Sequence, residues 1–321
     1  MTTRRPRLFM TGAAGYVGSV LTELALAEGY DVHGLSRSAT SDEKLLRLGA
    51  VPVRGDLTSV EVLRRESAEA DVVIGLATAC AVAQGSGGDE IMAIDEGALD
   101  ALGDALAGTD KPLVLTSGTL AVAADPSGAE TTETSPMDPN PDNLRTRYEA
   151  YARSLADRGV RVAIVRLAPY VYGRAGSRIE LFMTLSAQAG RVPCVDGGRN
   201  HTSIVHVDDA ARLYLLAAQR ASAGEVFNAS AATDVTARQI FEAIAAAVSV
   251  PLQEVALADA KTELGEVFAY FLSADHRASG EKATRVLGWQ PRGMGILHEI
   301  NKGSYQTLAR TLRSNDVSGE T

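Results

Sequence analysis

The sequence predicts an α/β fold in which helices cover both faces of a doubly wound parallel sheet, with a smaller second domain toward the C-terminus. Three observations support this prediction. Strand-like and helical patterns alternate through the first half, a glycine-rich turn joins the first strand to the first helix, and the pattern becomes less regular after Ala168. The chain has 321 residues, 45% of them hydrophobic, and is long enough to bury a large core.

Short apolar runs predict six strands in the first half of the chain. They cover residues 7–11, 31–35, 51–54, 72–76, 113–116 and 160–167. Helical patterns separate most of them, and this alternation is typical of a parallel sheet covered on both faces. Ligands of such sheets bind beyond the carboxyl ends of the strands, so we expect the functional site at that edge.

The second half mixes helical patterns with turns. We expect helices at about residues 179–189, from about Thr236, and before residue 287. Residues 123–140, rich in Pro, Thr, Ser and acidic side chains, are expected to form a mobile loop beside the site. The predicted division is a first domain at residues 1–168, to which residues 205–228 return, and a second domain mainly at residues 169–321.

The glycine-rich turn has the pattern TGxxGxxG at residues 11–18. Glycines between a strand and a helix let the backbone approach a pyrophosphate, and the helix N-terminus offers free N–H groups and a positive dipole end. The alternative is a structural turn with no ligand. The order of strand, turn and helix favours a dinucleotide site. The residues expected to contact the cofactor here are Gly12, Ala14, Gly15, Tyr16, Val17 and Gly18.

The end of the second strand predicts which dinucleotide binds. An acidic residue about 20 positions past the turn usually binds the ribose hydroxyls. Here Ser36 and Arg37 occupy that place. A guanidinium attracts a 2′-phosphate, which a carboxylate would repel, so we expect NADP(H) rather than NAD(H). The alternative is that Arg37 is a solvated surface charge.

Two further strand ends supply candidate cofactor contacts. Asp56, followed by Leu57, comes after the third strand. Its carboxylate could accept a hydrogen bond from the adenine amino group, or could instead cap a helix or form a turn. Ala77 ends the fourth strand, where a small side chain lets a flat dinucleotide pass close by or permits tight packing.

Composition excludes several classes of function. A net charge of −9 argues against a general nucleic-acid surface. No run reaches the roughly 18 to 20 apolar residues that cross a bilayer. Cys80 and Cys194 form no disulfide framework and suit a reducing cytoplasm, and the five histidines form no ligand pair, so we expect no metal.

Several segments together resemble the extended short-chain dehydrogenase/reductase superfamily, in its epimerase/dehydratase branch. They occur in the family's order and cover nearly the whole chain. The matching segments are residues 11–18 (TGAAGYVG), 55–57 (GDL), 166–173 (RLAPYVYG), 205–210 (VHVDDA) and 287–291 (LGWQP). The resemblance implies a Rossmann-like domain, an NAD(P) cofactor and a C-terminal domain that binds the substrate.

The segment VHVDDA has its own physical interpretation. Asp208 and Asp209 stand where a strand gives way to a helix. We expect one of them to cap that helix, and the pair to fix the junction of the two domains rather than to act in catalysis.

The chain departs from the resemblance at the residues that carry the family's chemistry. That chemistry requires a tyrosine, a lysine four residues later and a serine or threonine after the fifth strand. Counted back from Arg166, the tyrosine falls on Pro141 and the lysine on Arg145, and Glu149 falls on the glutamate that usually follows. Pro141 suits a first helical position with Asn140 as its cap. The chain therefore resembles an atypical subgroup that lacks YxxxK.

The hydroxyl position of the family falls on Gly118, between Ser117 and Thr119. Either hydroxyl could bind a substrate oxygen or serve the structure alone. Arg145 could bind the ribose or an oxyanion, but it is a poor proton donor because its pKa is above about 12.

Two tyrosines are candidates for the missing acid. Tyr148 lies three residues after Arg145, on the same helix face, where a cation would lower its pKa; the alternative is a packing tyrosine. The resemblance places Tyr170 near the nicotinamide. The candidate catalytic residues are Ser117, Thr119, Arg145, Tyr148 and Tyr170, of which Arg145 also counts as a cofactor contact.

Arg199 and His201 follow the turn at residues 195–198. In similar proteins this region lines the substrate pocket, and an unperturbed histidine, with a pKa of about 6.5, can act as acid or base. A polar surface histidine is the alternative.

The leading functional hypothesis is an NAD(P)-dependent oxidoreductase or epimerase that moves a hydride to or from a carbonyl or secondary alcohol of a small molecule. A non-redox lyase or cyclase on the same fold, or a non-catalytic NADP-sensing protein, would explain the missing tyrosine. The resemblance also suggests a homodimer through helices near residues 91–107 and 141–157. We expect a cytoplasmic protein without nucleic-acid or membrane partners.

Overall fold

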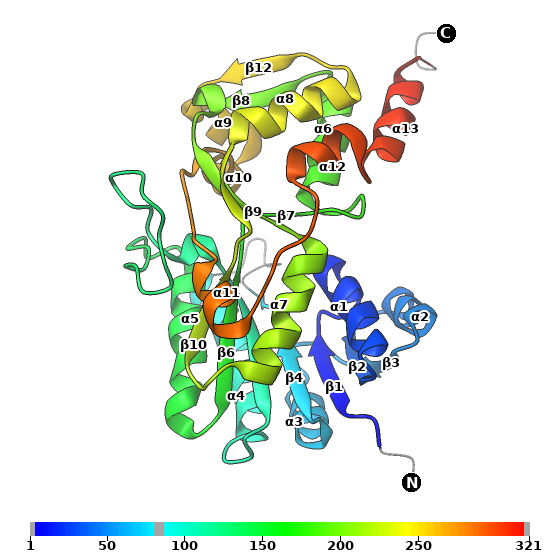
Figure 1. Ribbon diagram of the computed structural model, residues 1–321, viewed down its shortest axis with the longest axis vertical. Coiled ribbons are helices and arrows are strands. Elements are labelled where there is room, and N and C mark those ends of the chain that lie inside the picture. Colours follow the sequence, from blue (N-terminus) through cyan, green and yellow to red (C-terminus); the bar gives the residue numbers. More distant parts are fainter. Residues whose placement is uncertain (1–3, 80–86, 318–321) are drawn as a thin grey trace.

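The computed structural model describes residues 4–79 and 87–317, and its main feature is a seven-stranded sheet. The strand order is β10-β6-β5-β4-β1-β2-β3, and every neighbouring pair is parallel. Helices cover both faces (Figure 1). The predicted α/β fold with a doubly wound parallel sheet is confirmed.

The six predicted strands all form, each within two residues of its expected bounds. A seventh strand, β10, extends the sheet at one edge. The strands are β1 Arg7–Thr11, β2 Asp31–Ser36, β3 Val51–Arg54, β4 Val72–Gly75, β5 Pro112–Gly118, β6 Arg161–Leu167 and β10 Glu225–Ala229. Buried Leu, Val, Ile, Phe and Met side chains fill their centres, as expected for strands covered on both faces.

Two hydrophobic clusters hold the helices to the sheet. On one face lie α1 (Tyr16–Ala27), α2 (Ala39–Leu48), α7 (Val207–Arg220) and α11 (Glu281–Leu287). On the other face lie α3 (Val60–Glu69), α4 (Gly88–Asp104) and α5 (Leu144–Ser154). These faces leave the carboxyl edge of the sheet pointing toward the C-terminal elements (Figure 1).

A third cluster, which we call the C-terminal cluster, contains only residues between Tyr170 and Ala309. It holds two small sheets, one with the order β11-β9-β7 and one that pairs β12 with β8. The strands are β7 Tyr170–Tyr172, β8 Val192–Val195, β9 His201–His206, β11 Ala232–Thr236 and β12 Leu252–Val255. The helices are α6 Ser177–Ala189, α8 Ala237–Val248, α9 Leu257–Leu264, α10 Glu266–Ser273, α12 Ile296–Lys302 and α13 Gln306–Val317.

The chain crosses between the C-terminal cluster and the sheet more than once. Strand β10 forms one edge of the sheet, and helix α7 packs on its face. Ala283, Leu287 and Trp289 pack on the same face. Asp209 on α7 joins the two parts, because its carboxylate accepts hydrogen bonds from the backbone N–H groups of Arg292 at 2.9 Å and Gly293 at 2.7 Å. The domain boundary near Ala168 stays a prediction.

Two helices begin differently from the prediction. Pro141 is not the first residue of α5; it lies in an exposed turn in which the Asn140 side chain accepts from the Asp142 N–H at 3.0 Å. The helix begins at Leu144, and Asn143 caps it by accepting from the Arg145 N–H at 3.3 Å. Asn140, which was expected to cap the helix, instead stabilises the turn before it.

Helix α7 is capped by His206 instead of an aspartate. The His206 Nδ1 accepts a hydrogen bond from the Asp208 N–H at 3.2 Å. Asp208 and Asp209 occupy the first turn, where the helix dipole favours negative charge. Asp209 is not available as a cap because it binds the backbone of residues 292–293.

Residues 123–140 make backbone hydrogen bonds to neighbouring segments, and the expected mobility of this loop stays a prediction. Thr131 donates to the Arg277 carbonyl and accepts from the Ser279 N–H, both at 2.8 Å, and the Ala123 N–H donates to Pro136 at 3.0 Å. No helix in the described ranges, 4–79 and 87–317, is long and apolar enough to cross a membrane. Cys194 is a buried free thiol, whereas Cys80 lies outside the described residues.

Candidate functional site

The glycine turn closes tightly between β1 and α1. Gly12 has a φ of 72°, and the Gly15 N–H donates to the Gly12 carbonyl at 2.9 Å. A Cβ placed on Gly18 would lie 2.1 Å from the same carbonyl oxygen. Gly15 caps α1 without a side-chain hydrogen bond, and no acidic residue lies in the first turn. The turn therefore presents backbone N–H groups and a positive helix end, which fit a diphosphate.

Tyr16 connects this turn to the C-terminal elements. Its hydroxyl donates to the Gly173 carbonyl at 2.7 Å, and burial raises its pKa. The Tyr305 hydroxyl accepts from the Gly173 N–H and donates to the Gly176 carbonyl, both at 2.8 Å. The side chain of Tyr16 thus binds protein, and only its backbone is left for a phosphate.

The end of β2 presents an unpaired cation. Arg37 is exposed and makes no hydrogen bond or ion pair with any residue in the described ranges. Ser36 is buried, and its hydroxyl donates to the Ser38 carbonyl at 3.2 Å. Lys44 was not predicted: it reaches from α2 to the glycine turn, where its Nζ donates to the Ala14 carbonyl at 2.8 Å. The contact could not be predicted from the sequence, because Lys44 follows Ala14 by 30 residues.

Asp56 forms the turn that the alternative interpretation expected. Its Oδ1 accepts from the Thr58 N–H at 2.9 Å and from the Thr58 hydroxyl at 2.6 Å. The hydrogen bond from Thr58, aided by a second from Ser59, lowers the pKa of this carboxyl. The carboxylate is therefore ionised at neutral pH and fixed at the strand end, where a contact with adenine stays a prediction.

One small, mostly apolar cavity lies on the face of the sheet that α3, α4 and α5 cover. Leu57, Ala77 and Tyr148 are among the residues that line it. Tyr148 is 3% exposed and belongs to the cluster formed with α3, α4 and α5. This burial favours the packing interpretation of Tyr148. Its role as a proton donor stays a prediction.

The end of β5 gathers buried hydroxyls beside an arginine. Ser117 and Thr119 are each 1% exposed, and neither hydroxyl has a hydrogen-bond partner within residues 4–79 and 87–317. Arg145 passes over Gly118 between them, with its Cδ 3.4 Å from the position a Cβ would take there. The structure thus brings together the three residues that the sequence assigned to this strand end and to α5.

Tyr170 and Arg178 belong to the C-terminal elements; Tyr170 is buried, whereas the Arg178 side chain is exposed. The Tyr170 hydroxyl is buried without a partner among the described residues, and burial raises its pKa. The Arg178 Cζ lies 4.5 Å above the Phe271 ring, whose centroid is 5.1 Å from that of Tyr170. Partial removal from water, and then the positive charge of Arg145, lower the pKa of Arg178. Arg178 was not predicted from the sequence.

A buried ion pair fixes α5 against β6. Arg166 and Glu149 are both fully buried, and the guanidinium contacts the carboxylate at 2.5 and 2.9 Å. In this chain Glu149 is the buried partner of Arg166. It sets the position of Arg145, one turn earlier on the same helix.

His276 is a third residue that the sequence did not single out, after Lys44 and Arg178. It is 3% exposed, and neither ring nitrogen has a hydrogen-bond partner among the described residues. Burial, and to a smaller degree the charge of Arg166, lower the pKa of His276 to about 4. The imidazole is therefore neutral at physiological pH.

The two predicted substrate residues lie at the opposite end of β9 from the sheet. His201 is the first residue of β9, and its Nδ1 lies 3.6 Å from Asp275 Oδ1. Arg199 is exposed on the turn before it. Within the described residues, no hydrogen bond or ion pair joins either of them to Ser117, Arg145 or Tyr170.

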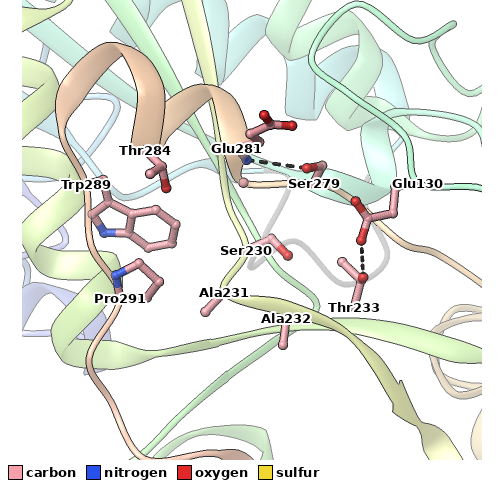
Figure 2. A pocket seen from close by; sticks show the side chains of 11 residues that line it. Glu130, Ser230, Ala231, Ala232, Thr233, Ser279, Glu281, Thr284, Trp289 and Pro291 are labelled. Atoms are coloured by element: carbon pink, nitrogen blue, oxygen red, sulfur yellow. Dashed lines mark hydrogen bonds between the residues drawn. The ribbon is translucent and has the colours of Figure 1, made fainter.

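A separate pocket of about 210 Å³ lies beyond the β10 edge of the sheet. In Figure 2 Trp289 and Thr284 line one side, Glu130 and Thr233 lie opposite, and Ser230 lies between them. Three strands separate β10 from β1, so at a spacing of about 4.8 Å the two strands lie about 19 Å apart. This pocket is distinct from the glycine turn.

Metal-binding side chains do not cluster in the described part of the chain. No group of three or more His, Cys, Asp or Glu side chains there could hold a metal ion.

Comparison with known proteins adds a family. The NAD dependent epimerase/dehydratase family profile matches residues 8–230. An uncharacterized protein of Schizosaccharomyces pombe is 31% identical over 301 residues, which cover 93% of this chain and 99% of that protein. A 4-hydroxy-2-methyl-3-oxo-4-farnesyl-3,4-dihydroquinoline-1-oxide ketoreductase of Stigmatella aurantiaca is 27% identical over 312 residues, covering 89% and 92%.

A solved structure of similar fold is the UDP-glucose 4-epimerase of Thermotoga maritima with UDP-glucose. It superposes with a TM-score of 0.75 at 20% identity, and the match covers 95% of this chain and 99% of the epimerase. At this identity the likeness concerns the fold.

Proposed function

The chain belongs to the NAD-dependent epimerase/dehydratase family, and we propose that it is an NADP(H)-dependent oxidoreductase or epimerase. It would act on a carbonyl or secondary alcohol of a small molecule. The enzyme would work in the cytoplasm and without a metal ion.

The observation that carries this proposal is the arrangement at the carboxyl edge of the sheet. The glycine turn after β1 offers a diphosphate cradle, and two strands along the sheet Ser117, Thr119 and Arg145 gather after β5. A dinucleotide bound to the turn would extend along this edge toward the hydroxyls. Arg37 would select NADP(H) through the 2′-phosphate.

Each candidate residue has a role that its surroundings permit. When bound, the cofactor supplies or accepts a hydride. The hydroxyls of Ser117 and Thr119 have unused donors and would hold the substrate oxygen. The Tyr170 hydroxyl is buried without a partner among the described residues and would donate a hydrogen bond to that oxygen, although burial raises its pKa and makes it a weaker acid than a free tyrosine. Arg145 would position the ribose or an oxyanion.

The first test is binding followed by turnover. Calorimetry should show NADP⁺ binding to the purified protein, with NAD⁺ binding more weakly. A panel of aldehydes, ketones and keto acids should then oxidise NADPH, followed at the absorbance band of the reduced nicotinamide. Failure of both NADP⁺ and NAD⁺ to bind would refute the proposal.

One observation favours two alternative functions. The first is a non-redox lyase or cyclase, and the second is an NADP-sensing protein. Pro141 replaces the family tyrosine and lies in an exposed turn, so no hydroxyl is supplied there. Product formation without any change in nicotinamide absorbance would support the lyase. Stabilisation by NADP⁺ without turnover of any compound in the panel would support the sensor.

A further inference from the structure

The pocket of about 210 Å³ beyond the β10 edge of the sheet has no part in the proposed reaction. We propose that it is a second binding site, for a small organic cation that carries an ammonium group. The inference goes beyond the proposed function and does not depend on it, because β10 and β1 lie about 19 Å apart.

Three segments that are distant in the sequence form the walls of this pocket. Glu130 comes from the segment 123–140, residues 230–233 follow β10 and enter β11, and the remaining lining residues lie between 279 and 291, in and around α11. Of the 11 lining residues none is basic, whereas Glu130 and Glu281 are acidic. Their negative charge favours a cationic ligand over a phosphate or a carboxylate.

Neither carboxylate is paired with a basic side chain in the described ranges. Glu130 and Glu281 are exposed, and no ion pair there involves either of them. The Glu130 carboxylate accepts a hydrogen bond from the Thr233 hydroxyl, which holds it beside the pocket (Figure 2). Arg277 lies close by, but its guanidinium donates to the carbonyls of Thr233 at 3.2 Å and Gly128 at 3.0 Å. The carboxylates therefore remain free to bind a cation from solution.

Ser230 is the buried polar side chain of this pocket. It is 4% exposed, and its hydroxyl has no hydrogen-bond partner among the described residues. In Figure 2 the hydroxyl points toward Glu130 and Thr233. Gly280 packs against the Ser230 backbone, since a Cβ at Gly280 would lie 2.1 Å from the Ser230 carbonyl oxygen. Buried hydroxyls normally have a partner, so this oxygen is an unused acceptor for an N–H of a ligand.

The other features of the pocket favour an organic cation over a metal ion. The Trp289 side chain supplies an aromatic surface, and its Nε1 is already used, because it donates to the Asp209 carbonyl at 2.9 Å. Aromatic surfaces attract organic ammonium groups. Within residues 4–79 and 87–317 no group of three or more His, Cys, Asp or Glu side chains could hold a metal ion. The volume is below the roughly 300 Å³ of pockets for drug-sized molecules, so the ligand is small.

The test uses the full-length protein without nucleotide and two probes, whose binding is followed by NMR of the probe. Ethanolamine, protonated at neutral pH, carries the ammonium group, and ethylene glycol has the same size with a hydroxyl in its place. Ethanolamine should bind with a Kd of about 10 mM or tighter, and ethylene glycol at least about tenfold more weakly, because only the ammonium makes charge-assisted hydrogen bonds.

Two substitutions of exposed carboxylates show where the cation binds. Glu130→Gln removes the charge but keeps an oxygen that can accept from Thr233, and it should weaken ethanolamine binding at least about fivefold. Glu61→Gln is the matched control. It removes the same charge from α3, where the carboxylate is 86% exposed and paired with Arg64, and it should leave the affinity unchanged.

Ser230→Ala separates a ligand-binding hydroxyl from a structural one. It should weaken ethanolamine binding at least about threefold without lowering the melting temperature, because the hydroxyl has no partner within the described residues to lose. Wild-type affinity in Ser230→Ala would count against the site. Absence of saturable ethanolamine binding, equal affinity for ethylene glycol, or equal losses in Glu130→Gln and Glu61→Gln would overturn it; the last result would indicate diffuse attraction to an acidic protein.

Discussion

At the scale of single residues, we predict that Arg37 selects NADP⁺ over NAD⁺. The side chain is exposed, unpaired among the described residues, and stands at the end of β2. Replacing it with alanine should weaken NADP⁺ binding roughly 10- to 100-fold, since charged hydrogen bonds contribute about 1.5–3 kcal/mol. NAD⁺ has no 2′-phosphate and should keep its affinity. Calorimetric titration of both dinucleotides checks this, and an equal loss for both would contradict the assignment.

His276 makes stability depend on pH. The unfolded chain binds this proton near pH 6.5, whereas burial lowers the pKa in the folded chain to about 4. Stability is therefore complete above about pH 6.5 and falls as the pH drops toward 4, by up to roughly 3 kcal/mol from this residue.

Urea unfolding between about pH 7.5 and 4 measures that effect. His276→Leu should flatten the acid limb of the stability curve, whatever its stability at neutral pH. His298→Leu, which removes an exposed histidine on α12, should keep the wild-type slope. A slope unchanged in His276→Leu would show that another group causes the loss.

At the scale of elements, the turn between β1 and α1 depends on glycine where the backbone closes on itself. A Cβ at Gly18 would meet the Gly12 carbonyl oxygen at 2.1 Å and the Ala13 Cα at 2.8 Å. Gly18→Ala should therefore lower the free energy of unfolding by about 1–3 kcal/mol and weaken NADP⁺ binding at least about tenfold.

Gly97→Ala on α4 is the matched control. No atom lies within 4 Å of a Cβ at that position, and alanine favours a helix over glycine by up to about 1 kcal/mol. We expect equal or higher stability and unchanged NADP⁺ affinity. Thermal unfolding and calorimetry check both variants; normal cofactor binding by Gly18→Ala would contradict the role assigned to the turn.

Periodicity predicted most of the sheet because its strands are buried on both faces. The first and third strands have the expected bounds, and the glycine turn lies where it was predicted. Helix caps were less predictable, because several polar residues compete for one N–H. Asn143, and not Asn140, caps α5, and His206 caps α7 because Asp209 binds residues 292–293.

The candidate site was predictable only in part, for a related reason. Ser117, Thr119 and Arg145 belong to the strand and helix that the family pattern marks, and they meet in space. Lys44 carries no motif, and it reaches the glycine turn only through long-range packing. Tyr148 illustrates the limit of helix geometry, which places it near Arg145 but does not reveal its burial.

At the scale of the whole molecule, Asp209 ties helix α7 to the segment that leads into α12. It is 1% exposed and accepts two backbone hydrogen bonds. Asp209→Ala should lower the free energy of unfolding by about 1–3 kcal/mol, because two part-buried N–H groups lose a charged acceptor. Asp208→Ala removes half-exposed contacts with Arg174 and His206 and should cost less than about 1 kcal/mol. Equal losses in urea unfolding would refute this role.

The largest-scale prediction is a homodimer through α4 and α5. These helices pack against one another within the chain, where the Tyr151 hydroxyl donates to Asp100 at 2.9 Å, and Ile94 on α4 remains 39% exposed. Alanine-rich faces on both helices suit close packing with a second copy. Light scattering should give twice the 33.7 kDa chain mass.

A charge placed in that contact should separate the copies, because an unpaired buried charge costs several kcal/mol. Ile94→Arg should therefore give a monomer with the wild-type melting temperature at low concentration. Leu185→Arg, which alters an equally exposed side chain on α6, should remain a dimer. A monomeric wild type would contradict the assembly, and a dimer in both variants would place its interface away from α4. Because Ser117 and Arg145 lie within one chain, we expect monomeric Ile94→Arg to keep its NADP⁺ affinity, which separates assembly from cofactor binding.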